Sequence, residues 1–138
     1  MEIQNFKDNI KVFYVKADSF PAGIKAAHNK LHSLLPSTVG RRFFGISYPA
    51  RSGSIIYKAA VEESLPGEAE KYGCETFVIK KGDYLSHTVS NWRKDESAIA
   101  NTFKKMLSDK RIDKNGYCLE VYPNERDIIC LVRLDSKK

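Results

Sequence analysis

The hexapeptide Phe44-Gly45-Ile46-Ser47-Tyr48-Pro49 recurs as Cys118-Leu119-Glu120-Val121-Tyr122-Pro123. Two related segments about half a chain apart indicate internal duplication, which constrains the whole fold. The segments differ in charge at one central position, because Ile46 in the first is matched by Glu120 in the second. The duplication predicts a symmetric fold, and this single carboxylate is the leading candidate for a functional residue.

A helix is predicted ahead of each hexapeptide. In residues 22–35 the apolar side chains recur at helical spacing behind Pro21, whose missing N–H costs nothing in a first helical turn. Residues 95–107 show the same spacing, with acidic residues first and lysines last, as the helix dipole favours. The interval from Pro21 to Asp95 equals that from Phe44 to Cys118, so both helices keep one register to the hexapeptides.

Strand-like segments surround these helices and hexapeptides. Four of them take matching places in the two halves: residues 10–17 and 84–89 before the helices, and residues 55–61 and 127–134 after the hexapeptides. The interval from Ile55 to Ile128 is one position shorter than the interval between the two hexapeptides. We interpret this difference as one residue lost from the loop after the second hexapeptide. Residues 75–80 form a further strand, and Lys81-Gly82-Asp83 is typical of a hairpin turn leading into residues 84–89.

The predicted fold is therefore α+β, with two strand–helix–strand–strand units at about residues 10–63 and 75–134. We expect one antiparallel sheet with two helices on one side. A chain of 138 residues that is 42% hydrophobic can bury the core of one domain, so residues 1–138 are interpreted as a single domain. No apolar run is long enough to span a membrane, and no signal peptide is expected, because residues 1–8 contain no apolar core. The three cysteines favour reduced thiols in the cytoplasm.

Charge and motif spacing exclude several function classes. The net charge is +6, but the basic pairs are scattered, so direct nucleic-acid binding is not expected as the main role. His28 and His32 have the i, i+4 spacing of a zinc site, yet no further ligand accompanies them, and no metal is expected. The chain has no phosphate-binding glycine loop and no triad motif, so no cofactor is expected.

The order of elements resembles the GyrI-like small-molecule-binding domains, which include gyrase-inhibitor proteins and the effector-binding domains of multidrug-type transcription regulators. The resemblance rests on residues 44–48, 77–84 and 119–123, and it extends from about Ile10 to Leu134. It implies an SHS2-type duplication with a pseudo-two-fold axis, and a ligand cleft between the halves on the side away from the helices. It also implies that Glu120 meets cationic, aromatic ligands, since many members have a cleft glutamate there.

Strand geometry supports the same site. Alternate residues of a strand share a face, so Cys118, Glu120 and Tyr122 point one way, while Leu119 and Val121 are expected to pack on the helix. By symmetry Phe44, Ile46 and Tyr48 share the equivalent face of the first half. A carboxylate among aromatic rings attracts an organic cation by Coulomb and cation–π interactions. The predicted ligand-binding residues are Glu120, Tyr122, Tyr48, Phe44, Ile46, Trp92 and Cys118.

Structural interpretations of these residues remain open at this point. Glu120 could be solvated or paired with a basic side chain, and the tyrosines could simply end their strands. Trp92 could close the cleft or cover the core beside the second helix. His87 is more simply interpreted as a solvated strand residue than as a titrating cleft group.

Three function classes remain. The first is a stand-alone protein that sequesters or senses hydrophobic cationic or aromatic small molecules. The second is a hydrolase of electrophilic small molecules, in which Glu120 would activate water and Tyr48 would polarise the leaving group. The third is an antagonist of a protein partner, such as gyrase or a regulator. The sequence favours the first class and leaves the ligand and the oligomeric state open.

Overall fold

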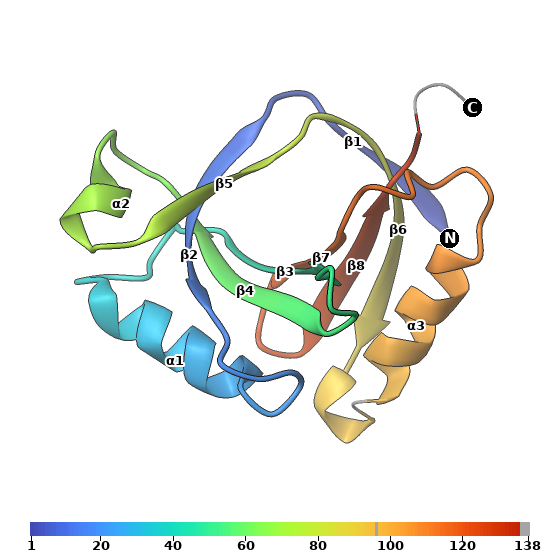
Figure 1. Ribbon diagram of the computed structural model, residues 1–138, viewed down its shortest axis with the longest axis horizontal. Helices are drawn as coiled ribbons and strands as arrows, with labels where there is room; N and C mark the ends of the chain where they lie inside the picture. The colour runs from blue at the N-terminus through green and yellow to red at the C-terminus, as the bar shows by residue number, and fades with distance from the viewer. Residues whose placement is uncertain (96, 136–138) are drawn as a thin grey trace. The chain divides into compact units, whose positions relative to one another are not determined.

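The computed structural model describes residues 1–95 and 97–135, and the chain forms two compact units in it (Figure 1). The central unit comprises residues 9–79. The terminal unit combines Met1–Asp8 with the segment from Lys80 onward. The chain therefore begins in the terminal unit, passes through the whole central unit and returns.

The central unit contains four antiparallel strands in the order β3-β4-β2-β5. Its elements, in chain order, are β2 (Ile10–Lys16), α1 (Ile24–Leu34), β3 (Phe43–Pro49), β4 (Ile55–Glu62), α2 (Glu68–Lys71) and β5 (Glu75–Ile79). Helix α1 packs on β2 and β4. Its buried residues Ala27 and Leu31 are four positions apart, so they lie on one face of the helix and meet Phe13 in the core.

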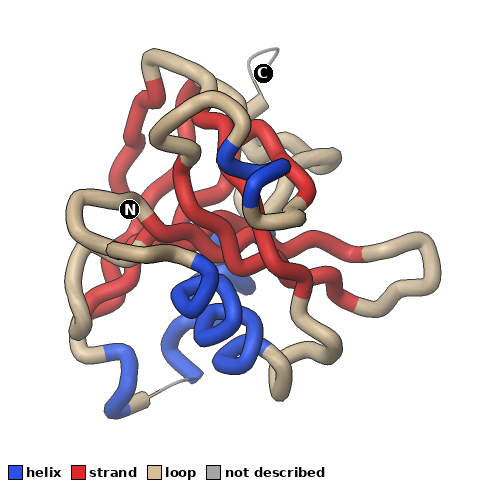
Figure 2. The backbone as a smooth tube through the Cα atoms, turned by 90° about the vertical axis from the view of Figure 1, so that its left-hand side faces the viewer, coloured by secondary structure: helices blue, strands red, loops and turns tan. Residues whose placement is uncertain are grey.

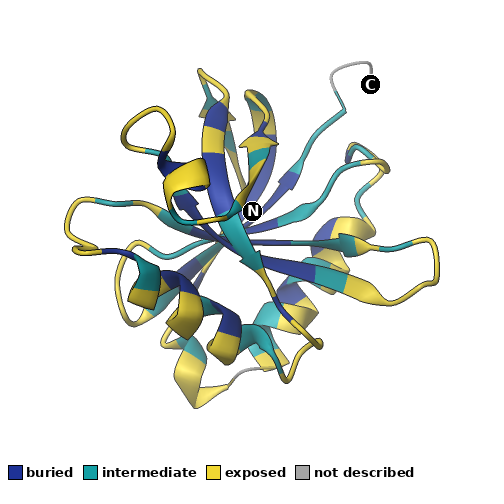
Figure 3. Ribbon diagram, turned by 60° about the vertical axis from the view of Figure 1, so that its left-hand side comes forward, coloured by how far each residue is buried: buried dark blue, intermediate teal, exposed yellow. Residues whose placement is uncertain are grey.

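The terminal unit contains four antiparallel strands in the order β1-β6-β8-β7. Its elements are β1 (Glu2–Phe6), β6 (Gly82–Ser90), the 3-10 helix η1 (Trp92–Lys94), α3 (Ser97–Leu107), β7 (Cys118–Val121) and β8 (Asp127–Arg133). Helix α3 packs on β6 and β8, with Met106 in a core that includes Leu85 and Cys130. Helices α1 and α3 are each buried along one side and exposed along the other (Figure 3).

The structure confirms the α+β class and the duplicated strand–helix–strand–strand order. One prediction about connections is wrong. Strand β5 pairs with β2 and belongs to the central unit, so Lys81-Gly82-Asp83 is not a hairpin turn between β5 and β6. Strand β1, which the sequence analysis did not anticipate, pairs with β6 instead. Each unit thus has a fourth strand: β5 follows the strand–helix–strand–strand segment of the central unit, and β1 precedes that of the terminal unit. The strands are drawn in red in Figure 2.

The register of the duplication differs by one position from the predicted one. Gly45 pairs with Ala59, and Cys118 pairs with Val132, and both partners lie on the helix-bearing face of their unit. The interval from Gly45 to Cys118 is the same as the interval between the first residues of α1 and α3, and between their last residues. Aligning the two hexapeptides uses an interval that is one position longer than the one from Gly45 to Cys118. The hexapeptide alignment is therefore one residue out of register with the structural repeat.

The loop between the two paired strands has therefore kept its length in both units. Gly45 and Ala59 are as far apart along the chain as Cys118 and Val132 are, so the predicted loss of one residue from the second loop is wrong. The apparent deletion was produced by the misaligned hexapeptides.

A one-residue slip moves every side chain of a strand to the other face. The true counterpart of Ile46 is Leu119, and both are fully buried. The counterpart of Glu120 is Ser47. The contrast between Ile46 and Glu120 therefore compares residues on opposite faces and is not a break in the symmetry.

Among residues 1–95 and 97–135, no helix combines the length and the apolar character that crossing a membrane requires.

Candidate functional site

Cys118, Glu120 and Tyr122 lie on the helix-bearing face of the terminal unit. Glu120 is directly opposite Cys130 on β8, and directly opposed residues share a face. Cys130 belongs to the core that α3 covers, and Cys118 and Tyr122 pack against the same core. The prediction that Leu119 and Val121 would pack on the helix is wrong, because the alternation starts one residue later than the repeat suggested.

Glu120 and Tyr122 are connected by a hydrogen bond. The Tyr122 hydroxyl donates to Glu120 Oε1 over 2.7 Å, and both side chains are half-buried. Burial first, and then the charges of Glu120 and Cys118, raise the pKa of the Cys130 thiol to about 12. The Cys130 thiol therefore stays protonated and unreactive. On the neighbouring strand β7, Glu120 is the only carboxylate.

Trp92 is half-buried and packs against the core of the terminal unit. Its backbone N–H donates to the carbonyl of Arg126 over 3.2 Å, which fixes η1 to the turn that follows β7. The Arg93 guanidinium lies 5.2 Å from the centre of the indole ring. These contacts agree with the interpretation of Trp92 as a cover over the core, and its role at the rim of a ligand site stays a prediction.

Phe44, Ile46 and Tyr48 lie on the face of the central unit that is turned away from α1. Ile46 is opposite Lys58, whereas the core beneath α1 contains the alternate residues Tyr57 and Ala59. Phe44 and Ile46 are at most 1% exposed, and only Tyr48 is accessible. The predicted residues therefore occupy two different kinds of face, and the symmetry argument for their convergence does not hold.

A lysine that the sequence patterns did not single out lies on the same face of the central unit as Phe44, Ile46 and Tyr48. Lys58 on β4 is only 8% exposed, and its Nζ lies 4.4 Å from the ring centre of Tyr14 and 4.9 Å from those of Tyr48 and Phe77. Strands β2, β3 and β5 each contribute one ring to this aromatic cage. The available signal was a lone charge within the otherwise apolar stretch Ile55–Val61.

His28 is a neutral, half-buried residue of α1. It shares a hydrogen bond of 2.9 Å with the Tyr57 hydroxyl. Burial, followed by the neighbouring His32, lowers the pKa of His28 to about 4. Among the described residues, no cluster of three metal-ligating side chains includes this pair. His87 is exposed on β6, in agreement with its interpretation as a solvated strand residue.

We expect the protein to lose stability as the pH falls from about 6.5 to about 4. The unfolded chain binds a proton at His28 in this range and the folded chain does not, so acid favours unfolding by at most ~3 kcal/mol. Urea denaturation at several pH values measures the slope. The variant His28→Gln should flatten it, whereas His87→Gln should not. An unchanged slope in His28→Gln would contradict the assignment.

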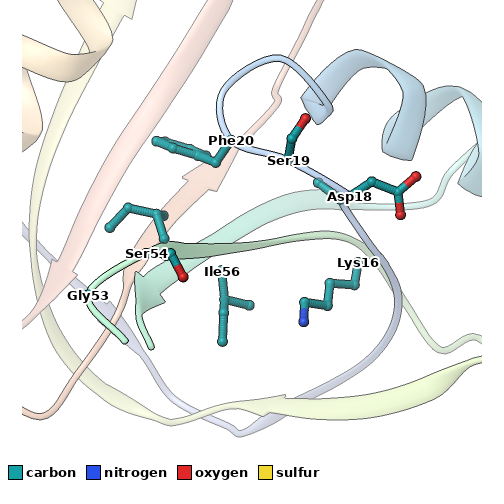
Figure 4. Close-up of a pocket in the computed structure, with 9 residues that line it drawn as sticks. Lys16, Asp18, Ser19, Phe20, Gly53, Ser54 and Ile56 are labelled. Atoms are coloured by element: carbon teal, nitrogen blue, oxygen red, sulfur yellow. The ribbon is translucent and has the colours of Figure 1, made fainter. Parts of the chain in front are cut away.

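An open pocket of about 390 Å³ lies at one end of the central unit, between the β2–α1 loop and the β3–β4 turn. Figure 4 shows Lys16 and Ile56 on one side of it, and Ser19 and Phe20 on the other. Lys16 is the cross-strand partner of Lys58, and Ile56 is the partner of Tyr48. Two residues that line the pocket are therefore direct cross-strand neighbours of residues in the aromatic cage.

Solved structures with the same fold are numerous. The integron cassette protein VCH_CASS2 from Vibrio cholerae is 11% identical, with a TM-score of 0.72 over 97% of this chain and 95% of that chain. SAV2435, solved bound to tetraphenylphosphonium, is 9% identical, with a TM-score of 0.68 over 99% and 94%. A protein named for bacterial transcription regulation, from Staphylococcus aureus MU50, is 9% identical, with a TM-score of 0.62 over 98% and 97%.

The fold is GyrI-like. The GyrI-like fold was the one implied by the order of elements, and the matches extend over nearly the whole chain. No protein-family model and no curated protein sequence matches the chain. Identities of 9% and 11% establish a shared fold alone, so the site has to be argued from the residues of this chain.

Proposed function

We propose that the protein binds hydrophobic, cationic small molecules at the helix-bearing face of the terminal unit, with Glu120 as the anionic contact. The observation that carries this proposal is the half-buried Glu120–Tyr122 pair on and beside β7, which lies on the same core as Trp92. The carboxylate, the phenol ring and the indole thus come from one unit and one face.

The chemistry of this pair suits an organic cation. The Glu120 carboxylate is half-buried and accepts a hydrogen bond from the Tyr122 hydroxyl, so it has exchanged part of its hydration for contacts within the protein. A bound cation adds Coulomb attraction, and neighbouring aromatic rings add cation–π attraction. A neutral ligand of the same shape gains only the apolar contact. Selectivity for positive charge is the expected consequence.

The comparison with SAV2435 supports the ligand class. That protein has the same fold and was solved with tetraphenylphosphonium, a bulky aromatic cation. Binding by this chain would serve to sequester such compounds or to sense them, and a role in transcription would require a DNA-binding partner, because the present chain carries no predicted DNA-binding motif.

The substitution Glu120→Gln should weaken the binding of tetraphenylphosphonium at least tenfold. It removes the charge and keeps the shape, and charge-assisted contacts of this kind contribute roughly 1.5–3 kcal/mol. Isothermal titration calorimetry measures the dissociation constants. Glu125→Gln is the matched control, because it removes the same charge from an exposed loop of the same unit and should change the affinity less than twofold.

Equal affinities of the parent protein and Glu120→Gln would remove Glu120 from the site. No binding to the parent protein would overturn the ligand class.

The hydrolase alternative is tested by incubating electrophilic esters and epoxides with the parent protein and with Glu120→Gln. Turnover that depends on Glu120 would replace the binding role by an enzymatic one.

A further inference from the structure

Lys58 is a buried cation without an anionic partner among the described residues. Only 8% of its surface is exposed, and the contacts that the structure gives its Nζ are the three rings of the aromatic cage. Within residues 1–95 and 97–135, no carboxylate lies at ion-pair distance from it. The rings contribute about 2 kcal/mol to holding the ammonium, and Nζ is not among the fully buried polar atoms that lack a hydrogen bond, so solvent still reaches it.

A second lysine increases the local positive charge. Lys16 on β2 stands directly opposite Lys58 on β4, so both side chains leave the same face of the sheet. Like charges in directly opposed positions repel each other. Two carboxylates on this face have other partners: Glu75 accepts a hydrogen bond of 2.7 Å from the Tyr14 hydroxyl, and Glu62 forms an ion pair with Arg42. Asp18 is exposed at the mouth of the pocket.

The surroundings of the two lysines combine aromatic rings with the mainly polar lining of the pocket, and both are partly accessible. The rings of Tyr14, Tyr48 and Phe77 are half-buried, and Ile56 continues this surface into the pocket of about 390 Å³. A pocket of this size falls in the range of small-molecule sites. Inorganic anions would use the lysines alone, whereas an aromatic anion would also stack on the exposed ring surface.

We propose that the face of the central unit turned away from α1 binds aromatic carboxylates, with the ligand carboxylate between Lys58 and Lys16 and its ring against Tyr48 and Ile56. This site has the opposite charge preference to the one at Glu120 and lies in the other unit, so it stands independently of the function proposed above. The ligand carboxylate supplies the anionic partner that Lys58 lacks among the described residues, and the two lysines no longer face each other uncompensated.

Titration calorimetry with 2-naphthoate tests this site, and 2-naphthamide is the neutral ligand of matched shape. We expect the parent protein to bind the naphthoate at least tenfold more tightly than the amide. Lys58→Met keeps the apolar stem and removes the charge, and it should weaken naphthoate binding at least tenfold. Lys16→Met should weaken it about threefold, because that ammonium is exposed and partly screened.

Lys25→Met is the matched control, since Lys25 is an exposed residue of α1 in the same unit and the substitution removes the same charge. It should change the affinity less than twofold, which separates a built site from general attraction to a chain of net charge +6. The proposal fails if the naphthoate and the amide bind alike, or if Lys25→Met weakens binding as much as Lys58→Met. If Lys58→Met does not fold, as judged by circular dichroism, the exposed Lys16→Met decides, and unchanged binding by it overturns the proposal.

Discussion

Replacing Glu68 by alanine should lower the free energy of unfolding by about 3–5 kcal/mol, because it leaves Arg41, whose side chain is only 14% exposed, without its counter-charge. Glu68 is 6% exposed at the start of α2. The Arg41 guanidinium donates to both of its carboxylate oxygens, over 3.3 and 2.7 Å. The backbone N–H groups of Ser64 and Leu65 donate to Glu68 Oε1 as well, over 2.6 and 3.0 Å.

These contacts connect three segments of the central unit through one carboxylate. Chiefly the hydrogen bond from Arg41, and then those from Leu65 and Ser64, lower the pKa of Glu68 to about 2 against the opposing effect of burial. The carboxylate therefore stays charged well into the acidic range. Removing it breaks the ion pair and also leaves two backbone donors without their acceptor, so the loss exceeds that of a surface salt bridge.

The chain supplies its own control for this experiment. Arg42, the next residue, forms a bidentate pair with Glu62, and the two side chains are 52% and 33% exposed. Glu62→Ala should cost less than about 1 kcal/mol. Urea denaturation followed by circular dichroism gives both values. Similar losses in Glu68→Ala and Glu62→Ala would show that burial does not decide the strength of these pairs.

Leu31→Ala should have the second large effect, a loss of about 2–5 kcal/mol, because it opens a cavity where α1 meets the sheet. Leu31 is fully buried in the cluster that includes Phe13, Tyr57 and Val61. A close-packed core cannot collapse fully around the missing carbon atoms, so contact energy is lost along with the transfer energy.

Leu107→Ala is the corresponding control, since this leucine ends α3 and is 51% exposed. It should cost less than about 1 kcal/mol. Urea denaturation gives the free energy of unfolding of each variant, and thermal unfolding gives the corresponding change in melting temperature. A loss below about 1 kcal/mol for Leu31→Ala would mean that α1 does not depend on this core contact for its place on the sheet.

The elements of this fold could be predicted from the sequence because their signals are local. The spacing of Ala27 and Leu31 in α1 and the apolar runs of β4 and β8 appear within windows of a few residues. Pairing partners have no such local signal. Strand β1 is short and mostly polar, and its side-chain contacts with β6, Phe6 on the ring of Tyr84 and Asn5 with Asp83, join residues far apart in the sequence.

The candidate site was harder to predict because it depends on register. The shared Tyr-Pro ending aligned Tyr48 with Tyr122, whereas the strand pairing places Tyr48 level with Val121. Sequence identity cannot distinguish these alignments, but a slip of one residue reverses the two faces of β7. Glu120 stays the candidate anionic contact, although the reason given for its orientation was wrong.

Lys58 could not have been ranked above other lysines from the sequence. Its cage is assembled from β2, β3 and β5, so the rings of Tyr14, Tyr48 and Phe77 come from distant parts of the chain. A lone charge in an apolar strand more often indicates an edge or a strand end. Only the pairing of Ile46 and Lys16 with Lys58 shows that it lies in the middle of the sheet.

The two crossings between the units have a consequence for the covalent chain. Ile10 and Ile79, at the ends of the central unit, are paired neighbours, and so are Phe6 and Gly82 on the terminal unit. In covalent terms the central unit is an insertion at the turn of a β-hairpin formed by β1 and β6. One excision would therefore give both parts as continuous polypeptides: residues 9–79 as they stand, and the terminal unit closed by a short turn between Phe6 and Gly82.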